Sequence, residues 1–233
     1  MITVAALTHN MTMIIRSLHA STNTVVVSWL PQYHDMGLIG SVLSLLYCGG
    51  SGAYFSPIVF IMNPCLWLLL ATKYHATHLQ GPNFAYSLIL RRFSSFAAKS
   101  SLSLQSIEHI FNAAEPIVVP VVKQFVSVFR EYGLRRGVMT GGYGLAESCV
   151  YVCDGGHQAL MLKREPYEKE NRVEVIGVWN EETEEKKGDN LEIPKSDILE
   201  LFSCGDVHKN PEVVIRIVHD NHDIGVITEQ FDY

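Results

Sequence analysis

Two short segments of the sequence carry side chains that could bind a ligand or take part in chemistry. In the first, the imidazole of His34 stands beside the carboxylate of Asp35, in a turn that follows a β-branched run. Loops at the carboxyl ends of strands are where α/β sheets usually bind ligands. In the second, Tyr143 lies between glycines, and Glu147 follows four residues later. A planar ring between glycines suits stacking on a nucleobase, and the carboxylate could hold Mg²⁺ against a triphosphate.

Each segment also has a simpler interpretation. His34 and Asp35 could only cap the helix that follows and bond each other. Tyr143 could be a core side chain in a glycine-rich turn, with Glu147 in solvent. The residues alone leave both interpretations open.

Local patterns indicate what holds the imidazole in place. The β-branched run Thr24–Val27 predicts a buried strand, and Ser41–Leu46 predicts a buried helix. Pro31 ends the strand, because proline has no N–H to give to a ladder. Gly37 and Gly40 let backbones pack closely where the helix begins. We therefore expect a strand, a turn with the imidazole, and a helix, in that order.

Strands and helices alternate along the rest of the chain, which predicts an α/β fold. Helices are expected at Leu7–Ala20 with Thr8 as N-cap, Leu66–Tyr74, Phe84–Phe93 and Val118–Tyr132. Strands are expected around Ala53–Phe55, Ala76–Gln80, Ile107–Ala114, Gly137–Thr140 and Val150–Val152. The charged segment Glu181–Asn190 is predicted to be a solvated loop.

Composition excludes some classes of function. The 233 residues suffice for one large domain or two small ones, and 48% of them are hydrophobic, so a substantial core is available. A net charge of −6 gives no basic surface for nucleic acid or an anionic membrane. The most apolar stretch, Ala53–Ala71, contains two prolines and polar residues, so we expect a buried loop and a helix rather than a membrane span.

The cysteines and the first residues bear on the compartment. There are five cysteines, an odd number, and no C-x-x-C pair, which favours reduced thiols. Met1–Ala6 lacks the basic and long apolar regions of a secretory signal. We therefore expect a cytoplasmic protein.

Three further groups could bind ligands, but each has a structural explanation. Cys149, Cys153 and His157 could hold zinc, although the intervening residues predict a strand. The glycines of Gly49–Gly52 are explained by a tight connection between helix and strand. Asn83 follows a predicted strand, where its amide could either cap the next helix or meet a ligand.

Four blocks in the sequence together resemble one enzyme family. They are Ser28–Gly40 (SWLPQYHDMGLIG), Gly81–Tyr86 (GPNFAY), Asn112–Pro116 (NAAEP) and Tyr143–Glu147 (YGLAE). Their order, spacing and content resemble fatty acyl-AMP ligases, a branch of the acyl-adenylate-forming, AMP-binding enzymes. The likeness covers nearly the whole chain.

The resemblance implies a fold of layered sheets with helices on their faces, as in the N-terminal domain of an adenylate-forming enzyme. Residues 1–233 would be a partial AMP-binding domain. The family's phosphate-binding loop normally precedes a segment like Thr8-His9-Asn10. That loop is absent from this sequence, as is the small C-terminal domain with its catalytic lysine. We therefore expect this chain alone to be inactive.

The resemblance also implies a reaction. A fatty acid and ATP give an acyl-adenylate with the help of Mg²⁺. The acyl group then passes to an acyl carrier protein or to the carrier domain of a polyketide or peptide synthase. The long separation between Glu147 and Ser203-Cys204-Gly205 resembles acyl-AMP ligases in particular. Two alternatives are a non-catalytic remnant that binds nucleotide or acyl chain, and an acyl-CoA synthetase.

Roles for single residues follow from the same resemblance. The catalytic residues would be His34 and Glu147, with Glu147 also bound to Mg²⁺. The acyl pocket would include His34, Asn83 and Phe84. The nucleotide would be bound by Asn112, Ala113, Ala114, Glu115, Pro116, Gly142, Tyr143, Gly144, Leu145 and Ala146. Ala113 stands where the family usually has glycine. Asp206 falls in an earlier block than the family's ribose-binding aspartate, so we do not expect it to bind ribose.

Overall fold

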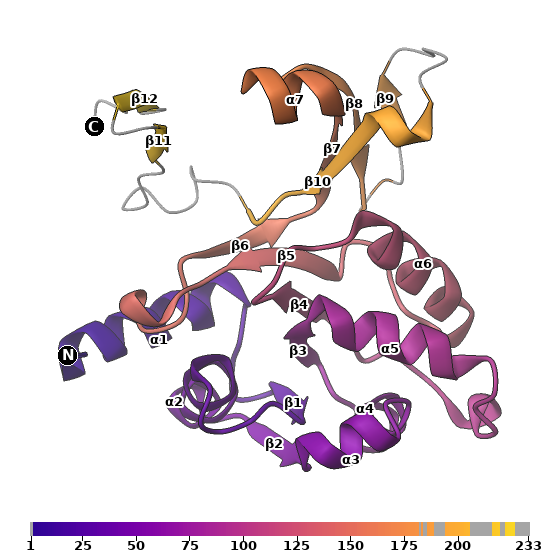
Figure 1. Cartoon of the computed structure of the whole chain (residues 1–233). Coiled ribbons are helices and arrows are strands. Elements are labelled where there is room, and N and C mark those ends of the chain that lie inside the picture. Colours follow the sequence, from indigo (N-terminus) through magenta and orange to yellow (C-terminus); the bar gives the residue numbers. More distant parts are fainter. Residues whose placement is uncertain are drawn as a thin grey trace.

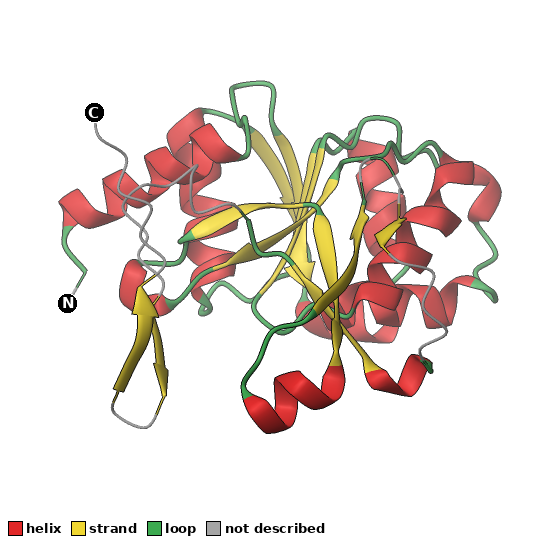
Figure 2. Cartoon of the chain, turned by 90° about the horizontal axis from the view of Figure 1, so that it is seen from above, coloured by secondary structure: helices red, strands yellow, loops and turns green. Residues whose placement is uncertain are grey.

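The computed structural model describes residues 2–181, 183, 186–188, 194–205, 216–219 and 222–226. For the three short stretches 186–188, 216–219 and 222–226, it describes the main chain. Helices lie on both sides of a central sheet, and a second sheet follows later in the chain (Figures 1 and 2). The layered α/β architecture predicted from the sequence is confirmed.

The central sheet has six strands, and their order places the segments predicted to bind ligands side by side. The order is β2 (Ser51–Tyr54), β1 (Val25–Ser28), β3 (His78–Pro82), β4 (His109–Ala113), β5 (Met139–Tyr143) and β6 (Cys153–Gly156). The first five strands are parallel, and β6 is antiparallel to β5. The carboxyl ends of β1, β3, β4 and β5 therefore meet at one edge.

Helices cover both faces of this sheet (Figure 2). One face carries α4 (Leu66–Tyr74), α5 (Asn83–Phe93) and α6 (Val119–Phe129). The other carries α1 (Val4–Ser17), the π-helix η1 (Met36–Leu43) and α2 (Ser44–Cys48). α3 (Pro57–Met62) joins β2 to α4, and 3₁₀ turns occur at Lys99–Ser101, Arg130–Tyr132, Ala146–Ser148 and Lys195–Asp197.

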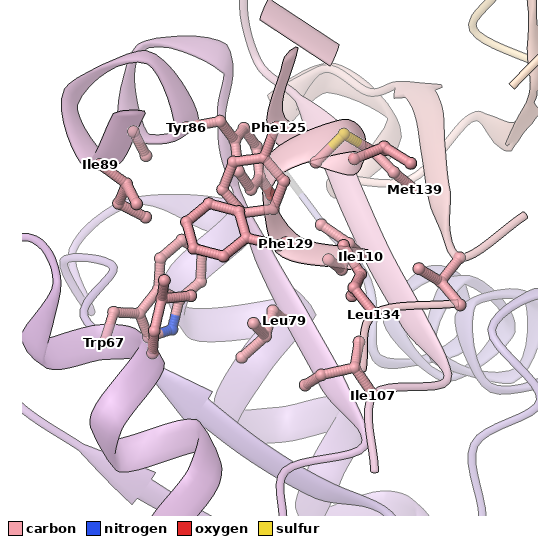
Figure 3. Packing of buried hydrophobic residues seen from close by; sticks show 14 of the residues in the cluster. Trp67, Leu79, Tyr86, Ile89, Ile107, Ile110, Phe125, Phe129, Leu134 and Met139 are labelled. Carbon is pink, nitrogen blue, oxygen red and sulfur yellow. The ribbon is translucent and has the colours of Figure 1, made fainter. Parts of the chain in front are cut away.

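The main core lies between the sheet and α4, α5 and α6 (Figure 3). Trp67, Tyr86, Phe125 and Phe129 are almost completely buried there. Each such side chain contributes about 1.5–3 kcal/mol by its burial. The Trp67 indole also donates a hydrogen bond of 2.7 Å to the Val27 carbonyl, which ties α4 to β1. This core fixes the strands whose ends carry the candidate site.

The second sheet is antiparallel, in the order β10 (Ile198–Phe202), β7 (Gln158–Lys163), β8 (Val175–Asn180) and β9 (Lys186–Gly188). α7 (Arg164–Glu170) follows β7 (Figure 1). β11 (Arg216–His219) and β12 (His222–Val226) form a two-stranded ribbon. Among the residues just enumerated, no helix is both long and apolar enough to cross a bilayer.

Two helices differ from the prediction at their starts. α1 begins at Val4 rather than Leu7, because the Thr3 hydroxyl, not that of Thr8, caps it and accepts from the Ala6 N–H at 3.1 Å. The helix expected at Ser41 begins instead at Met36, as a π-helix.

Side-chain hydroxyls support that π-helix. Ser41 Oγ donates to the Met36 carbonyl at 3.4 Å, and Ser44 Oγ donates to the Ile39 carbonyl at 2.7 Å, each five residues back. Gly37 is needed here, because a Cβ at this position would lie 2.1 Å from the Pro31 carbonyl oxygen. The predicted close packing of backbones at Gly37 is confirmed.

Two strand and loop predictions were wrong. The stretch after Ser56 is not a buried loop, because the Ser56 hydroxyl caps α3 by accepting from the Ile58 N–H at 3.2 Å. The strand expected at Val150–Val152 begins instead at Cys153, and it includes Gly155 and Gly156. Gly156 pairs with Gly141, and a Cβ on it would lie 1.9 Å from the Ser203 carbonyl oxygen.

The charged segment 181–190 is not wholly a loop, because β9 lies within it and pairs with β8. The remaining predictions for residues 189–193 and 206–215, including Asp206, lie outside the described residues.

Candidate functional site

The edge where the strands end contains a cavity of about 170 Å³. The loop after β1 contributes His34, Asp35 and Met36 to its wall. The end of β4 contributes Ala113 and Ala114, and Gly144 follows β5. Three of the four blocks singled out in the sequence therefore meet at one cavity.

The turn that carries His34 contains both the ion pair and the helix cap that the simpler interpretation predicts. The His34 Nδ1 lies 2.8 Å from Asp35 Oδ1, and Asp35 caps η1 by accepting from the Met36 N–H at 2.7 Å. The imidazole is nevertheless 53% exposed and lines the cavity. The carboxylate thus orients a ring that a ligand in the cavity can reach.

The wall formed by the end of β4 contains an unusual backbone conformation. Ala114 has φ +71°, a left-handed conformation that L side chains rarely adopt. The turn is held by Glu115, whose carboxylate accepts a hydrogen bond from the Phe84 N–H. Strain of this kind is concentrated at functional sites, and Ala114 lines the cavity.

Asn83 does not cap α5, because Pro82 precedes that helix without any side-chain cap. The Asn83 Oδ1 instead accepts from the Val118 N–H at 3.2 Å and from Asn112 Nδ2 at 3.4 Å. The buried Asn83 side chain therefore links the end of β3 to β4 and to the residue before α6. Phe84 packs edge-on against Trp29. Neither Asn83 nor Phe84 lines the cavity.

Tyr143 lies at the end of β5 and is 52% exposed, so its ring is open to a ligand. The glycines beside it have a different reason from the one expected. A Cβ on Gly142 would lie 2.0 Å from the Phe111 ring, and one on Gly144 would lie 1.8 Å from the Val150 carbonyl oxygen. Neighbouring protein atoms, rather than a purine, require these glycines.

Leu145, Ala146 and Glu147 form the turn after Tyr143. Glu147 is exposed in the 3₁₀ turn. Its carboxylate oxygens are ligands of the type that Mg²⁺ prefers, and such an ion keeps waters and substrate phosphates as its other ligands. Within the described part of the chain, no three His, Cys, Asp or Glu side chains gather to hold a metal ion. Glu147 therefore offers a cation one carboxylate at this turn.

The inner wall of the cavity was not predicted. It is formed by Ile14 of α1, Leu18 directly after that helix, Gln80 of β3, Phe111 of β4, and Tyr151. These residues carry no local motif, and strand register and helix docking bring them together. The sequence contained one indication that α1 would reach this wall, namely Asn10 in the segment Thr8-His9-Asn10. Its buried amide donates to the Tyr151 carbonyl at 2.7 Å and accepts from the Tyr151 N–H at 3.1 Å, which docks α1.

A buried polar cluster lies beyond this wall, between α1 and the sheet. The rings of His78 and His109 stack 5.9 Å apart. His78 Nε2 lies 2.7 Å from the Leu18 carbonyl oxygen, which requires a proton on that nitrogen. Burial lowers the pKa of His78, and burial together with neighbouring histidines lowers the pKa of His109 to about 3. Both rings are therefore uncharged at neutral pH.

Asp154 supplies the negative charge of the cluster. Its carboxylate accepts a hydrogen bond from the Ser17 hydroxyl, and the Tyr151 hydroxyl lies 2.9 Å from the same oxygen. The other oxygen lies 3.6 Å from His109 Nε2. Burial, with the Asp154 charge, raises the pKa of Tyr151, so that hydroxyl stays protonated as a donor. The cluster joins α1 to β4 and β6.

Comparison with known proteins identifies the family of the chain. A family model described as AMP-binding enzyme matches residues 1–190. A medium-chain fatty acid–acyl-carrier-protein ligase, JamA of Moorena producens, is 35% identical over 180 residues, covering 76% of this chain and 30% of the relative. The ligase TtuA of Teredinibacter turnerae, named for the same activity, is 39% identical over 165 residues, covering 69% and 26%.

Solved structures give the same result. The fatty acyl-adenylate ligase from L. pneumophila, in complex with acyl adenylate and pyrophosphate, matches with a TM-score of 0.75 and 32% identity. That match covers 88% of this chain and 34% of the other. The chain thus spans about 30% of the length of JamA and 34% of that solved chain. The chain belongs to the AMP-binding enzyme family, and within that family it is similar to fatty acyl-AMP ligases.

Proposed function

We propose that this chain forms the acyl- and adenylate-facing part of a fatty acyl-AMP ligase. In that reaction a fatty carboxylate oxygen attacks the α-phosphorus of ATP, and pyrophosphate leaves. The thiol of a phosphopantetheine arm on a carrier protein or carrier domain then attacks the acyl carbonyl, and AMP leaves. The observation that carries the proposal is the cavity where His34, Ala114 and Gly144 meet at the ends of three parallel strands.

Each residue has a distinct part in this proposal. Tyr143 offers an exposed ring for the adenine. Ala113 and Ala114 line the cavity and would form the wall against the adenine. Glu147 meets the Mg²⁺ that accompanies the phosphates. His34 faces the acyl carboxylate, while Asn83 acts by joining the end of β3 to Asn112 of β4.

Binding by the 233 residues is a separate question from turnover. None of the described residues that line the cavity is a lysine or an arginine. Charge that develops on a transferring phosphoryl group needs such cations, each typically worth a few kcal/mol. We therefore propose that this chain binds the acyl-adenylate but does not form it at the rate of a complete ligase. The cavity lining without lysine or arginine is the observation that favours a second candidate function, binding without catalysis.

A non-hydrolysable acyl-adenylate, in which a sulfamate replaces the phosphate, tests the binding proposal. We expect calorimetry to show saturable binding to the chain, with competition by AMP. The matched control is the same sulfamate with the adenosine replaced by a methyl group. A folded chain that binds neither the analogue nor AMP contradicts the proposal.

Pyrophosphate exchange with a fatty acid tests the turnover proposal. We expect exchange by the chain alone to fall far below that of a complete relative assayed in parallel. Exchange at the relative's rate would show that the described cavity needs no further cation, and would rule out the second candidate.

A further inference from the structure

A second, smaller cavity of about 30 Å³ lies behind the first. The two cavities share Ile14, Leu18, Gly40, Gln80 and Phe111 as lining residues. The first cavity reaches the carboxyl ends of the strands. The second continues along the same face of the sheet to His78 and His109, which precede Gln80 and Phe111 by two residues on β3 and β4. Together they outline one channel along the sheet.

Gln80 lies where the two cavities adjoin. It is paired with Phe111 in the register of β3 and β4, so the two side chains lie beside each other on one face. The amide is buried, and its Nε2 donates a hydrogen bond to Ser41 Oγ of η1. A Cβ on Gly40 would lie 3.1 Å from its Oε1. The side chain therefore spans the gap between β3 and η1 and divides the channel.

The inner cavity suits the end of an alkyl chain. Val26 of β1 and Leu45 of α2 contribute apolar walls. Its floor contains the His78 and His109 rings, and burial lowers the pKa of both. The floor is thus uncharged at neutral pH, and a charged group would pay a desolvation cost there that methylene groups do not.

We propose that the Gln80 side chain is the inner stop of the acyl site and sets the longest fatty acyl tail that the site accepts. The proposal rests on the proposed function, because it takes the larger cavity to hold the acyl chain. With Gln80 in place, the tail ends against the amide. Without it, the two cavities join and longer tails gain contacts.

Gln80→Ala tests this proposal through the chain-length dependence of binding. Saturated fatty acids of increasing length are titrated into wild type and variant by displacement of a fluorescent fatty acid. We expect wild-type affinity to rise about fourfold with each methylene and then to stop rising at a limiting length. In Gln80→Ala we expect that limit to move to a longer acid. An unchanged limit in a folded variant overturns the proposal.

Two controls distinguish the effect of losing the bulk of Gln80 from the effect of losing its hydrogen bond and from a general loss of packing. Gln80→Met keeps the bulk without the amide, and we expect the wild-type limit. Val26→Ile fills only the inner cavity. Alone, it should leave the limiting chain length unchanged. Combined with Gln80→Ala, it should cancel part of the increase in limiting length that Gln80→Ala causes. If Gln80→Met moves the limit as far as Gln80→Ala does, the stop is not the side chain's bulk, and the proposal fails.

Gly40→Ala provides a test that does not depend on Gln80→Ala folding. Its methyl group would enter the space beside the Gln80 Oε1. We expect the limiting length to become shorter, and an unchanged limit counts against the proposal.

Primary alcohols of matching length separate this proposal from the proposed function. A shift of the limit for alcohols, without binding of acids, would support Gln80 as the stop and contradict acyl-acid binding. Binding of acids with no shift in any variant would leave the proposed function intact and overturn the stop. If neither the wild type nor any variant binds acids or alcohols, both the proposed function and the proposed role of Gln80 are overturned.

Discussion

Ala114 holds a left-handed backbone at the wall of the cavity, and this strain makes a prediction about stability. Glycine adopts φ +71° at no steric cost, whereas alanine pays about 1–2 kcal/mol. Glycine loses more entropy on folding, by roughly 0.5–1 kcal/mol. We expect Ala114→Gly to raise the free energy of unfolding by a few tenths to about 1 kcal/mol.

Ala113 is the matched control, since it is buried in β4 and has no positive φ. We expect Ala113→Gly to lower the free energy of unfolding by about 0.5–1 kcal/mol. Urea denaturation of both variants measures the difference. Equal effects of the same sign would show that the conformation at Ala114 carries no strain.

Tyr143 and His34 lie at the ends of different strands, and this separation predicts different effects on binding. We expect Tyr143→Ala to weaken AMP binding about fivefold, because a stacked ring contributes roughly 1 kcal/mol, whereas Tyr143→Phe keeps the ring and the affinity. We expect His34→Ala to weaken binding of the acyl sulfamate analogue but not of AMP. Calorimetry with both ligands measures this. Variants that only lose thermal stability would favour the structural interpretation of both residues.

Two buried histidines with lowered pKa values, His78 and His109, lie between α1 and the sheet, so the stability of the fold should be sensitive to acid. The pKa of His109 is lowered to about 3, and that of His78 is also lowered. An unfolded histidine titrates near 6.5, so the unfolded chain binds more protons below that value. The free energy of unfolding should therefore fall as the pH drops from about 6.5 towards 3.

The groups that face His109 are His78, His19 and His157, which disfavour its charge, and Asp154, which favours it. Well below pH 6.5, one such histidine gives a slope of about 1.4 kcal/mol per pH unit. Urea titrations between neutral and mildly acid pH measure this slope. We expect His109→Gln to reduce it. An equal slope in that variant would assign the acid sensitivity to other groups.

The elements differ in how far the sequence could predict them. α4 was predicted with its observed ends from an apolar run of helical length. In the structure the helix stops where His75 adopts a left-handed conformation. The π-helix could not be predicted, because it depends on Ser41 and Ser44 bonding carbonyls five residues back. The late start of β6 reflects the 3₁₀ turn before it and the positive φ of Cys149. Local propensity describes neither the π-helix nor the late start of β6.

The candidate site divides in the same way. His34, Ala114 and Gly144 belong to recognisable blocks at strand ends, and the structure brings these blocks together. Gln80 and Phe111 have no motif, and their place in the wall follows from the register between β3 and β4. Long-range pairing of this kind cannot be inferred from one sequence.

The surface of the molecule predicts how the chain behaves in solution. α3 exposes Ile58 and Met62, 71% and 77% accessible, on one side of a short helix. Contiguous exposed apolar groups of this kind promote association. We expect concentration-dependent association by light scattering, which Ile58→Lys combined with Met62→Lys should reduce. The control is Gln32→Lys, an exposed polar site. A monodisperse monomer at every concentration would contradict this prediction.

The π-helix η1 has a consequence for insertions and deletions in this chain. A π-helix contains one residue more than the α-helical path between the same ends would need. Removing a single residue between Leu38 and Leu43 would let the segment close as an ordinary α-helix. Because the two ends would keep their places, His34 before η1 and α2 after it should stay where they are, with α2 held by α1 and β2. The same deletion from an ordinary α-helix would instead rotate one end against the other by about 100°, the turn of one residue.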